Sequence, residues 1–221
     1  MKTADEIRAY LLANLEAMLA RPSMYGTNSG LESTILDRLR DLCFVDDRTP
    51  MFDRALDDMR RRNEFLSTGV VGAFRYFHLA KTEDVTDEVA SVYAAVAFRL
   101  GYFRPSRLLT SSEWNKLNER LPLWMKEDER SPADLVGTFG PPSYRSLAQR
   151  PRVFSYTVDD LDSAWVHFDF SSLRSRSKVA PLHPSMLLRD VRTGSADFSE
   201  RMLFTQLGES EHASEPEFVV D

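Results

Sequence analysis

Residues 131–170 read SPADLVGTFGPPSYRSLAQRPRVFSYTVDDLDSAWVHFDF, and this stretch decides the fold. Ser131 is typical of a helix N-cap, and the proline after it is favoured at the first helical position. A Gly-Pro-Pro turn ends the helix, and two runs rich in aromatic and β-branched residues follow at 152–158 and 164–170. The short acidic turn between these runs predicts a β-hairpin. We expect a capped helix that leads into an antiparallel sheet.

The second run has two different faces, because side chains alternate along a strand. One face carries Val166, Phe168 and Phe170, and the other carries Trp165, His167 and Asp169. We expect the first, apolar face to pack in the core. On the second face, His167 and Asp169 suit a general base with its orienting carboxylate, but they suit a solvent-facing polar pair equally well. We favour the solvent-facing interpretation.

The chain before this stretch is predicted to be helical. Two sequences, Thr3-x-x-Glu6 and Ser29-x-x-Glu32, match the capping box, and apolar residues follow each of them at helical spacing. Further buried helices are expected at 68–80 and 85–100. We expect about six helices in this region, packed as a bundle or an orthogonal array.

The residues after the hairpin complete an α+β protein. A third strand is predicted at 186–191, and a last strand or short helix at 197–207. We expect a helical region at 1–125, a helix with an antiparallel sheet at 126–207, and a mobile acidic tail at 208–221. The first two parts are compatible with either two domains or one.

The composition is that of an ordinary globular protein, with 221 residues, 43% hydrophobic and 28% charged. A net charge of −6 argues against general nucleic-acid binding, which needs a basic surface. No apolar run approaches the ~20 residues of a membrane span, and the start lacks the pattern of a signal peptide. The single cysteine, Cys43, fits a reducing compartment. We therefore expect a cytoplasmic protein.

The motifs of the common catalytic chemistries are absent from the sequence. It contains no phosphate-binding loop, no Gly-x-Gly-x-x-Gly, no Gly-x-Ser-x-Gly elbow and no His-Glu-x-x-His. The four histidines are thinly spread, and the acidic turn at 159–162 lacks the glycine and distal glutamate of a calcium loop. We expect no metal and no cofactor, and His167 with Asp169 are the sole catalytic candidates.

Two groups of residues are candidates for binding a partner. Phe154, Tyr156 and Trp165 form an interface anchor if they share an uncovered face, and otherwise they belong to the core. The second group consists of Arg174, Arg176 and Lys178. It lies in a segment with an excess of positive charge, which suits an acidic protein partner.

The turn Arg21-Pro22-Ser23-Met24-Tyr25-Gly26 resembles turns in two kinds of protein. In gyrase-B-type ATPases a similar turn leads into the nucleotide-binding helix. Here the next helix lacks the Glu-x-x-x-Asn-Ser arrangement that holds magnesium and phosphates in that family, and no Asp-x-Gly-x-Gly follows, so we reject ATP binding. The turn is also similar to one in small uncharacterised bacterial cytosolic proteins, some of them in toxin–immunity settings. That resemblance carries no catalytic residues, and a Met/Tyr plug that packs the corner between the two helices is the interpretation we favour for the turn.

Three functions are compatible with these features. We favour a non-enzymatic bacterial protein that binds another protein, of the toxin-immunity or phage-conflict type. The first alternative is a hydrolase or transferase that uses His167 and Asp169 in a cleft. The second is a regulatory scaffold that forms a homodimer through the edge of the hairpin.

Overall fold

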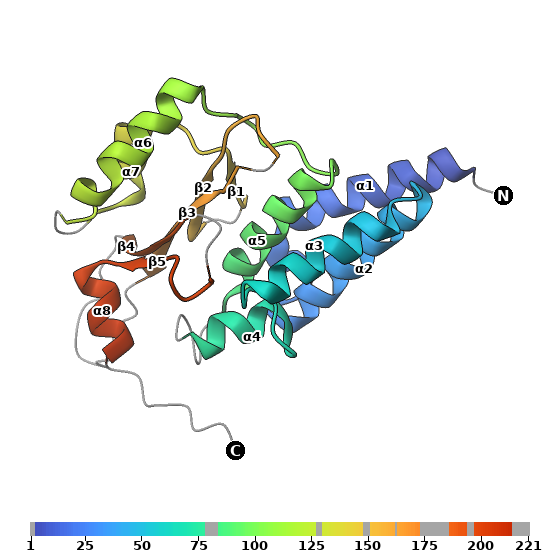
Figure 1. The fold of residues 1–221 in the computed structure, drawn as a ribbon, viewed down its shortest axis with the longest axis horizontal. Coiled ribbons are helices and arrows are strands. Elements are labelled where there is room, and N and C mark those ends of the chain that lie inside the picture. Colours follow the sequence, from blue (N-terminus) through green and yellow to red (C-terminus); the bar gives the residue numbers. More distant parts are fainter. Residues whose placement is uncertain are drawn as a thin grey trace, which may run out of the picture.

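The computed structural model describes residues 3–77, 84–126, 130–147, 151–161, 163–172, 186–193 and 197–213. In these ranges most of the helices precede an antiparallel sheet, so the predicted α+β fold is confirmed (Figure 1). The helices are α1 (Ala4–Ala20), α2 (Ser29–Val45), α3 (Thr49–Arg61), α4 (Gly69–Tyr76), α5 (Thr86–Arg99), α6 (Ser111–Trp124), α7 (Pro132–Phe139) and α8 (Gln206–Ala213), with a 3-10 turn at Pro22–Met24. The strands are β1 (Tyr144–Arg145), β2 (Val153–Tyr156), β3 (Val166–Ser172), β4 (Met186–Arg192) and β5 (Met202–Phe204).

Local capping starts several of these helices. At α1 the Thr3 hydroxyl accepts from the Glu6 N–H at 3.2 Å, and the Glu6 carboxylate accepts from the Thr3 N–H at 2.8 Å, which confirms the predicted capping box. Ser131 caps α7 in the same reciprocal way, with Asp134 as its partner. Each box satisfies backbone donors that a helix N-terminus leaves without intrahelical acceptors.

The capping box predicted at Ser29 is wrong. The N-cap of α2 is Asn28, and the Glu32 carboxylate instead accepts from the backbone N–H groups of Val70 (2.6 Å) and Val71 (3.1 Å) at the start of α4. Glu32 is buried, and the hydroxyl of Tyr93 also donates to it at 2.7 Å. A carboxylate is stabilised by the exposed N–H groups and the dipole of a helix N-terminus. Because α4 packs against α2, the Glu32 side chain caps the N-terminus of α4 and not that of its own helix.

The sheet is a five-stranded antiparallel meander with the order β1-β2-β3-β4-β5. Its central pairing places Phe168 opposite Phe154 on β2 and opposite Val191 on β4. A β-bulge interrupts the β3–β4 ladder, because Asp169 pairs with Asp190 whereas Phe170 pairs with Leu188. Arg189 is therefore the extra residue in β4.

The apolar face of the sheet packs against α6 and α7, as the alternation predicted for Val166, Phe168 and Phe170. These side chains form one core with residues of both helices, including Trp124 and Phe139. Figure 1 shows the sheet between this pair of helices and the larger group α1–α5. The helix α6 lies within the stretch predicted as the helical region, yet it packs on the sheet.

The opposite face of the sheet is buried too, so the solvent-facing interpretation of His167 and Asp169 is wrong. His167 is 7% exposed and Asp169 is fully buried. The physical reason is that α5 covers this face; for example, Arg192 of β4 hydrogen-bonds Ser91 of α5 at 2.9 Å. The sheet therefore has helices on both faces, and one of its two interior surfaces is charged.

The last described element is α8, which begins before the predicted tail and continues through its first residues. Thr205 precedes the helix, and its hydroxyl accepts from the Gly208 N–H at 3.2 Å. The Thr205 N–H and hydroxyl each donate to the Arg189 carbonyl at 2.9 Å, which ties α8 to β4. The rest of the predicted tail, 214–221, lies outside the described residues. None of the helices in the described ranges is both long enough and apolar enough to cross a bilayer.

Candidate functional site

The β-bulge determines which side chains of β4 enter the charged interior. In a regular strand Arg189 would share the apolar face with Val191, which lies two residues further on. The bulge places two successive residues opposite one partner, so Arg189 and Asp190 both lie on the α5 side, where the Arg189 Nε is 2.8 Å from the Asp190 carboxylate. Arg192 follows on the same face, which gives β4 three buried ionisable residues.

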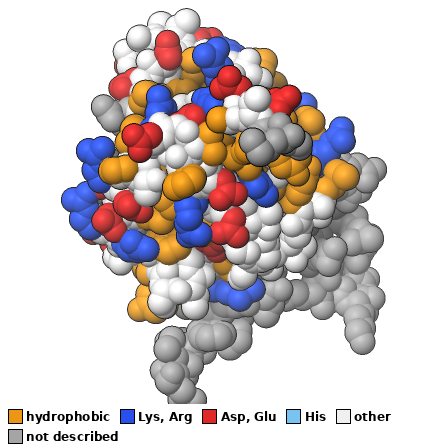
Figure 2. All heavy atoms as spheres, turned by 90° about the vertical axis from the view of Figure 1, so that its right-hand side faces the viewer, with side chains coloured by type: hydrophobic (Ala, Val, Ile, Leu, Met, Phe, Trp, Pro, Cys, Tyr) orange, Lys and Arg blue, Asp and Glu red, His pale blue; other side chains and the backbone are white. Residues whose placement is uncertain are grey.

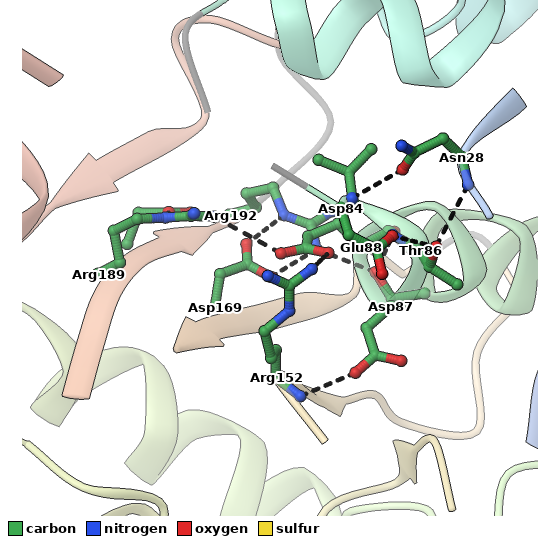
Figure 3. Close-up of polar contacts among 12 residues, drawn as sticks. Asn28, Asp84, Thr86, Asp87, Glu88, Arg152, Asp169, Arg189 and Arg192 are labelled. Carbon is green, nitrogen blue, oxygen red and sulfur yellow. Dashed lines mark hydrogen bonds and ion pairs between the residues drawn. The ribbon is translucent and has the colours of Figure 1, made fainter. Parts of the chain in front are cut away.

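The start of α5 is fixed from a distant part of the chain. The side-chain oxygen of Asn28 accepts from the Val85 N–H at 2.8 Å, and the Asn28 N–H donates to the Thr86 hydroxyl at 3.2 Å (Figure 3). Asn28 directly follows the turn formed by residues 21–27. This turn therefore has a structural role. It fixes the end of α5 from which Glu88 points toward the sheet.

Arg192 and Asp169 form a two-point ion pair within the charged interior (Figure 3). The guanidinium is held at 2.5 Å and 3.0 Å from the two carboxylate oxygens. Arg152 lies 3.3 Å from the Glu88 carboxylate, and its backbone N–H donates to Asp87 at 2.9 Å. Buried charges are stabilised where they are paired in this way, so these residues connect the sheet to α5.

Asp190 lies directly opposite Asp169 in the ladder, and the two buried carboxyls have different proton affinities. Burial and the nearby charge of Asp169 raise the pKa of Asp190 to about 8. The pKa of Asp169 is lowered to about 2 because the attraction and hydrogen bonds of Arg192 outweigh its burial. Two close carboxylates do not both ionise readily, so Asp190 holds a proton at neutral pH.

His167 has a partner of its own. Its Nδ1 shares a hydrogen bond with the buried Ser155 hydroxyl at 2.8 Å, and its ring stacks on Trp165 with centroids 5.9 Å apart. Burial, followed by the charge of Arg192, lowers the pKa of His167 well below its ordinary value, so the imidazole is neutral at neutral pH. His167 and Asp169 share a face, as predicted, but the Asp169 carboxylate is held by Arg192 rather than oriented on the imidazole.

A small cavity opens beside this charged interior, where the ends of α3 and α5 meet the sheet. Its volume is about 80 Å³. The buried residues Trp165, His167, Arg192 and Phe198 form its floor. Its partly exposed wall includes Arg62, Arg99, Ser163, Thr193 and Arg201.

Positive charge predominates in this cavity. Four arginines line it, and Glu64 is the one acidic residue in the described part of the lining. Glu64 contacts both Arg62 at 3.1 Å and Arg201 at 3.5 Å, and Arg192 is matched by Asp169. Arg99 makes no hydrogen bond or ion pair with any described residue. The charges of Glu64 and Asp58 reach Arg99, but the cavity presents this arginine without an ion-pair partner in the described ranges.

Two further donors in the lining lack acceptors in the described ranges. They are the buried Nε of Arg62 and the indole Nε1 of Trp165. Most buried polar groups in folded proteins have hydrogen-bond partners. Burial, and then repulsion by the Arg62 charge, lowers the pKa of Arg99. An anion in the cavity would supply a negative charge beside Arg99.

The residues predicted to bind a partner lie in different places. Phe154 and Tyr156 are buried in the core under α6 and α7, whereas Trp165 is buried on the other face of the sheet, against Phe98. The three aromatic residues therefore do not form a shared surface anchor. Arg174, Arg176 and Lys178 lie outside the described residues.

The arginines of the cavity come from four separate parts of the chain, and no local pattern identified them as a set. Arg62 belongs to a run of three arginines at the end of α3, where the helix dipole already accounts for positive charge. Arg99 gave a clearer signal, since it is a cation near the end of an alanine-rich helix that is otherwise buried.

Comparison of this chain with known protein families, with curated proteins and with solved structures finds no match. In the described parts of the chain, no three His, Cys, Asp or Glu side chains gather in a way that would hold a metal ion.

Proposed function

We propose that this protein is a non-enzymatic binding protein, and that it binds an anionic group of a partner protein in the arginine-lined cavity. The observation that carries the proposal is the state of Arg99, which lies in a concave site where the charges of Glu64 and Asp58 reach it but no described residue forms an ion pair with it. A partly buried cation without a partner is unfavourable in the free protein. It becomes favourable when a ligand supplies the negative charge.

The size of the cavity favours a group that belongs to a larger molecule. Pockets for complete small molecules usually have volumes of roughly 300–1,000 Å³, whereas this cavity has about 80 Å³. It has room for one anionic group of a few atoms, and the remainder of the ligand would lie across the partly exposed wall. A side chain on a protein surface meets this requirement.

The charge of the whole protein suits a partner whose surface is otherwise basic. The net charge is −6, which favours encounters with basic partners. On the side of the molecule shown in Figure 2, acidic and basic side chains are intermixed with hydrophobic ones. Some of these charges are exposed ion pairs within one helix, such as Asp37 with Arg40 at 3.0 Å. The cavity is a more concentrated site of positive charge.

The toxin-immunity or phage-conflict role is a narrower form of the same proposal. It adds that the partner is a toxin or a phage protein, and it rests on the resemblance of the turn at Arg21–Gly26. A basic enzyme that presents one anionic side chain would combine the long-range attraction with the local recognition in the cavity.

The two alternative functions have less support. In a hydrolase or transferase, His167 would need Asp169 as its orienting group, but the His167 ring is hydrogen-bonded to Ser155. For a homodimer through the hairpin, β2 and β3 would need a free edge, and each has a strand on both sides. The edges of the described sheet are β1 and β5, which have two and three residues; such short edges are poor templates for pairing.

The proposal is tested by matched affinity captures from a bacterial lysate. The baits are the unaltered protein, Arg99→Gln, and the control Arg104→Gln, which removes an exposed arginine outside the cavity lining. We expect a partner that the unaltered protein and the Arg104 variant retain and that the Arg99 variant loses. Identical sets of captured proteins from all three baits, or no partner for any bait, would contradict the proposal.

A further inference from the structure

We infer that the cavity takes up a proton together with its anion, and that His167 is the residue that accepts this proton. The inference rests on the proposed function, because it concerns the same site. It goes further by assigning a second residue to the site and by stating how acidity regulates the binding of the partner.

His167 is placed so that one of its ring nitrogens reaches the cavity. The residue forms part of the floor, and its Nδ1 shares a hydrogen bond with the Ser155 hydroxyl at 2.8 Å. The Nε2 has no hydrogen-bond partner among the described residues, and it is not one of the fully enclosed polar atoms. It is therefore the polar atom that His167 offers to a ligand in the cavity.

In the free protein the surroundings hold the imidazole in its neutral form. Burial is the main cause, and the charges of Arg192 on β4 and Arg201 add to it, so the pKa of His167 lies well below its ordinary value. The charge of Asp169 acts in the opposite direction, but this carboxylate is bound by Arg192. The contact from β2 is the uncharged Ser155. The remaining charged residues of the described cavity lining are Arg62, Glu64 and Arg99.

An anion in the cavity would reverse this preference. The cavity has a volume of about 80 Å³, so an anion that occupies it lies close to the whole lining, including His167. An opposite charge within ~4–6 Å favours the charged form of a titratable group and moves its pKa by about 1–3. The bound anion offsets the repulsion by the arginines, and the imidazolium gains a counter-charge.

Protonation requires no rearrangement around the ring. A neutral imidazole has one donor and one acceptor nitrogen, whereas an imidazolium has two donors. The Ser155 hydroxyl can donate to Nδ1 or accept from it, so the same contact serves both forms. The Nε2–H is then free to donate to the anion.

The proton and the anion therefore favour each other's binding. By thermodynamic linkage each raises the affinity for the other by the same factor. Because His167 is neutral in the free protein, the affinity for the anion increases as pH falls and decreases as pH rises. Mild acid would strengthen the complex with the partner, and a return to higher pH would weaken it.

The coupling is measured with sulfate, whose charge is constant between pH 5.5 and 7. Asp190, with a pKa of about 8, remains largely protonated in this range. Calorimetric titration at several pH values gives the affinity, and its repetition at pH 6.2 in Bis-Tris and imidazole buffers, which differ in ionisation enthalpy, gives the number of protons taken up. We expect sulfate to bind at least threefold more tightly at pH 5.5 than at pH 7, with a net uptake of protons.

Nuclear magnetic resonance identifies the group that titrates. The imidazole chemical shifts of His167 report its pKa with and without sulfate. We expect saturating sulfate to raise this pKa by at least one, which corresponds to a tenfold gain in the affinity for sulfate when His167 is protonated. This measurement uses the unaltered protein, so it decides the question even if a variant fails to fold.

Variants assign the proton and the anion to the cavity. His167→Gln keeps a polar side chain that cannot accept the proton, so its affinity for sulfate should be the same at pH 5.5 and pH 7. Arg99→Gln should weaken sulfate binding at both pH values. Arg104→Gln, which removes an exposed arginine outside the lining, should behave like the unaltered protein.

The outcomes separate this inference from the proposed function. Sulfate binding that Arg99→Gln weakens, but that is independent of pH and leaves the pKa of His167 unchanged, would overturn the coupling and leave anion binding in place. Proton uptake that persists in His167→Gln would overturn the assignment to His167. No binding of sulfate, or binding that no cavity variant changes, would overturn both.

Discussion

Arg192 and Asp169 are joined through both oxygens of the carboxylate, at 2.5 Å and 3.0 Å, in the interior between the sheet and α5. Asp169 is fully buried, and Arg192 is 4% exposed. Arg192 also reaches the Ser91 hydroxyl on α5 and lies over the ring of Phe74 on α4. One side chain therefore connects β3 and β4 of the sheet to two helices.

Asp169→Asn should strongly destabilise the protein, because it leaves the Arg192 guanidinium buried without its counter-charge. Loss of one partner of a buried pair typically costs about 3–5 kcal/mol of the free energy of unfolding. Urea denaturation measures this loss. Asp37→Asn, which breaks an exposed pair on α2, is the matched control and should change stability little. Equal effects of the two substitutions would show that the buried pair contributes no more to the free energy of unfolding than the exposed pair does.

The proton on Asp190 gives a pH dependence of defined sign. Its pKa is about 8 in the folded protein and about 4 in the unfolded chain. Between these values the folded state holds a proton that the unfolded state has released, so stability falls as pH rises. The contribution of Asp190 is fully present below pH ~4 and is lost as pH rises through ~8.

Asp190→Asn removes this titration. The difference in unfolding free energy between the unaltered protein and the variant should therefore fall as pH rises from 5 to 8, by at most about 1.4 kcal/mol per pH unit. The pKa of Asp169 is lowered to about 2 in the folded protein. The stability that Asp169 contributes is therefore lost only as pH falls below about 4, the pKa of an aspartate in the unfolded chain, and this loss lies below the window of pH 5 to 8. The contribution of His167 is common to both proteins. A difference that is constant with pH would refute the prediction.

Arg99→Met should make the free protein more stable, because it removes a partly buried cation that repels Arg62. Replacing charged groups in such positions by apolar residues is often neutral or stabilising, here by about 1 kcal/mol. Thermal unfolding without ligand measures the effect, and Arg104→Met is the control. A loss of stability would mean that the guanidinium has a structural partner in the folded protein.

Two glycine substitutions should have opposite effects. Gly69 has φ +80° at the start of α4, and an added Cβ would lie 2.6 Å from the carboxyl carbon of Glu32. Gly69→Ala should therefore destabilise the protein by about 2 kcal/mol or more. Gly137 lies in α7 with open space around it, so Gly137→Ala should stabilise the protein by roughly 0.5–1 kcal/mol. Chemical denaturation of both variants measures the contrast, and the same sign for both would refute it.

The features that could be predicted from the sequence are those set by neighbouring residues. The capping of α1 and α7, and the apolar face of Val166, Phe168 and Phe170, depend on short-range spacing, and the structure confirms them. The misassigned role of Glu32 shows the limit of such patterns. Its spacing from Ser29 fits a capping box, but its actual partners are Val70 and Val71, which are far away in the sequence.

The charged interior and the cavity depend on contacts that are distant in the sequence. Alternation in β3 identifies a polar face, but whether that face meets water or a helix depends on where α5 packs. The bulge that turns Arg189 toward α5 has no glycine or proline to mark it. The cavity needs the ends of α3 and α5 to meet the sheet, so its arginines could not be grouped before the fold was known.

The bulge also determines how a shortened chain would behave. Residues 186–188 pair with β3 on one side of Arg189, and residues 190–192 pair with it on the other. A chain without Arg189 could therefore form a regular ladder. Each of the remaining β4 side chains would stay on the face of the sheet that it occupies now. The shortened chain would lose the guanidinium beside Asp190 and the carbonyl that accepts from Thr205. A deletion of one residue would thus spare the sheet, remove an interior contact and leave the Leu188 carbonyl, at 2.9 Å from the Thr205 hydroxyl, as the remaining acceptor for the residue that precedes the C-terminal helix.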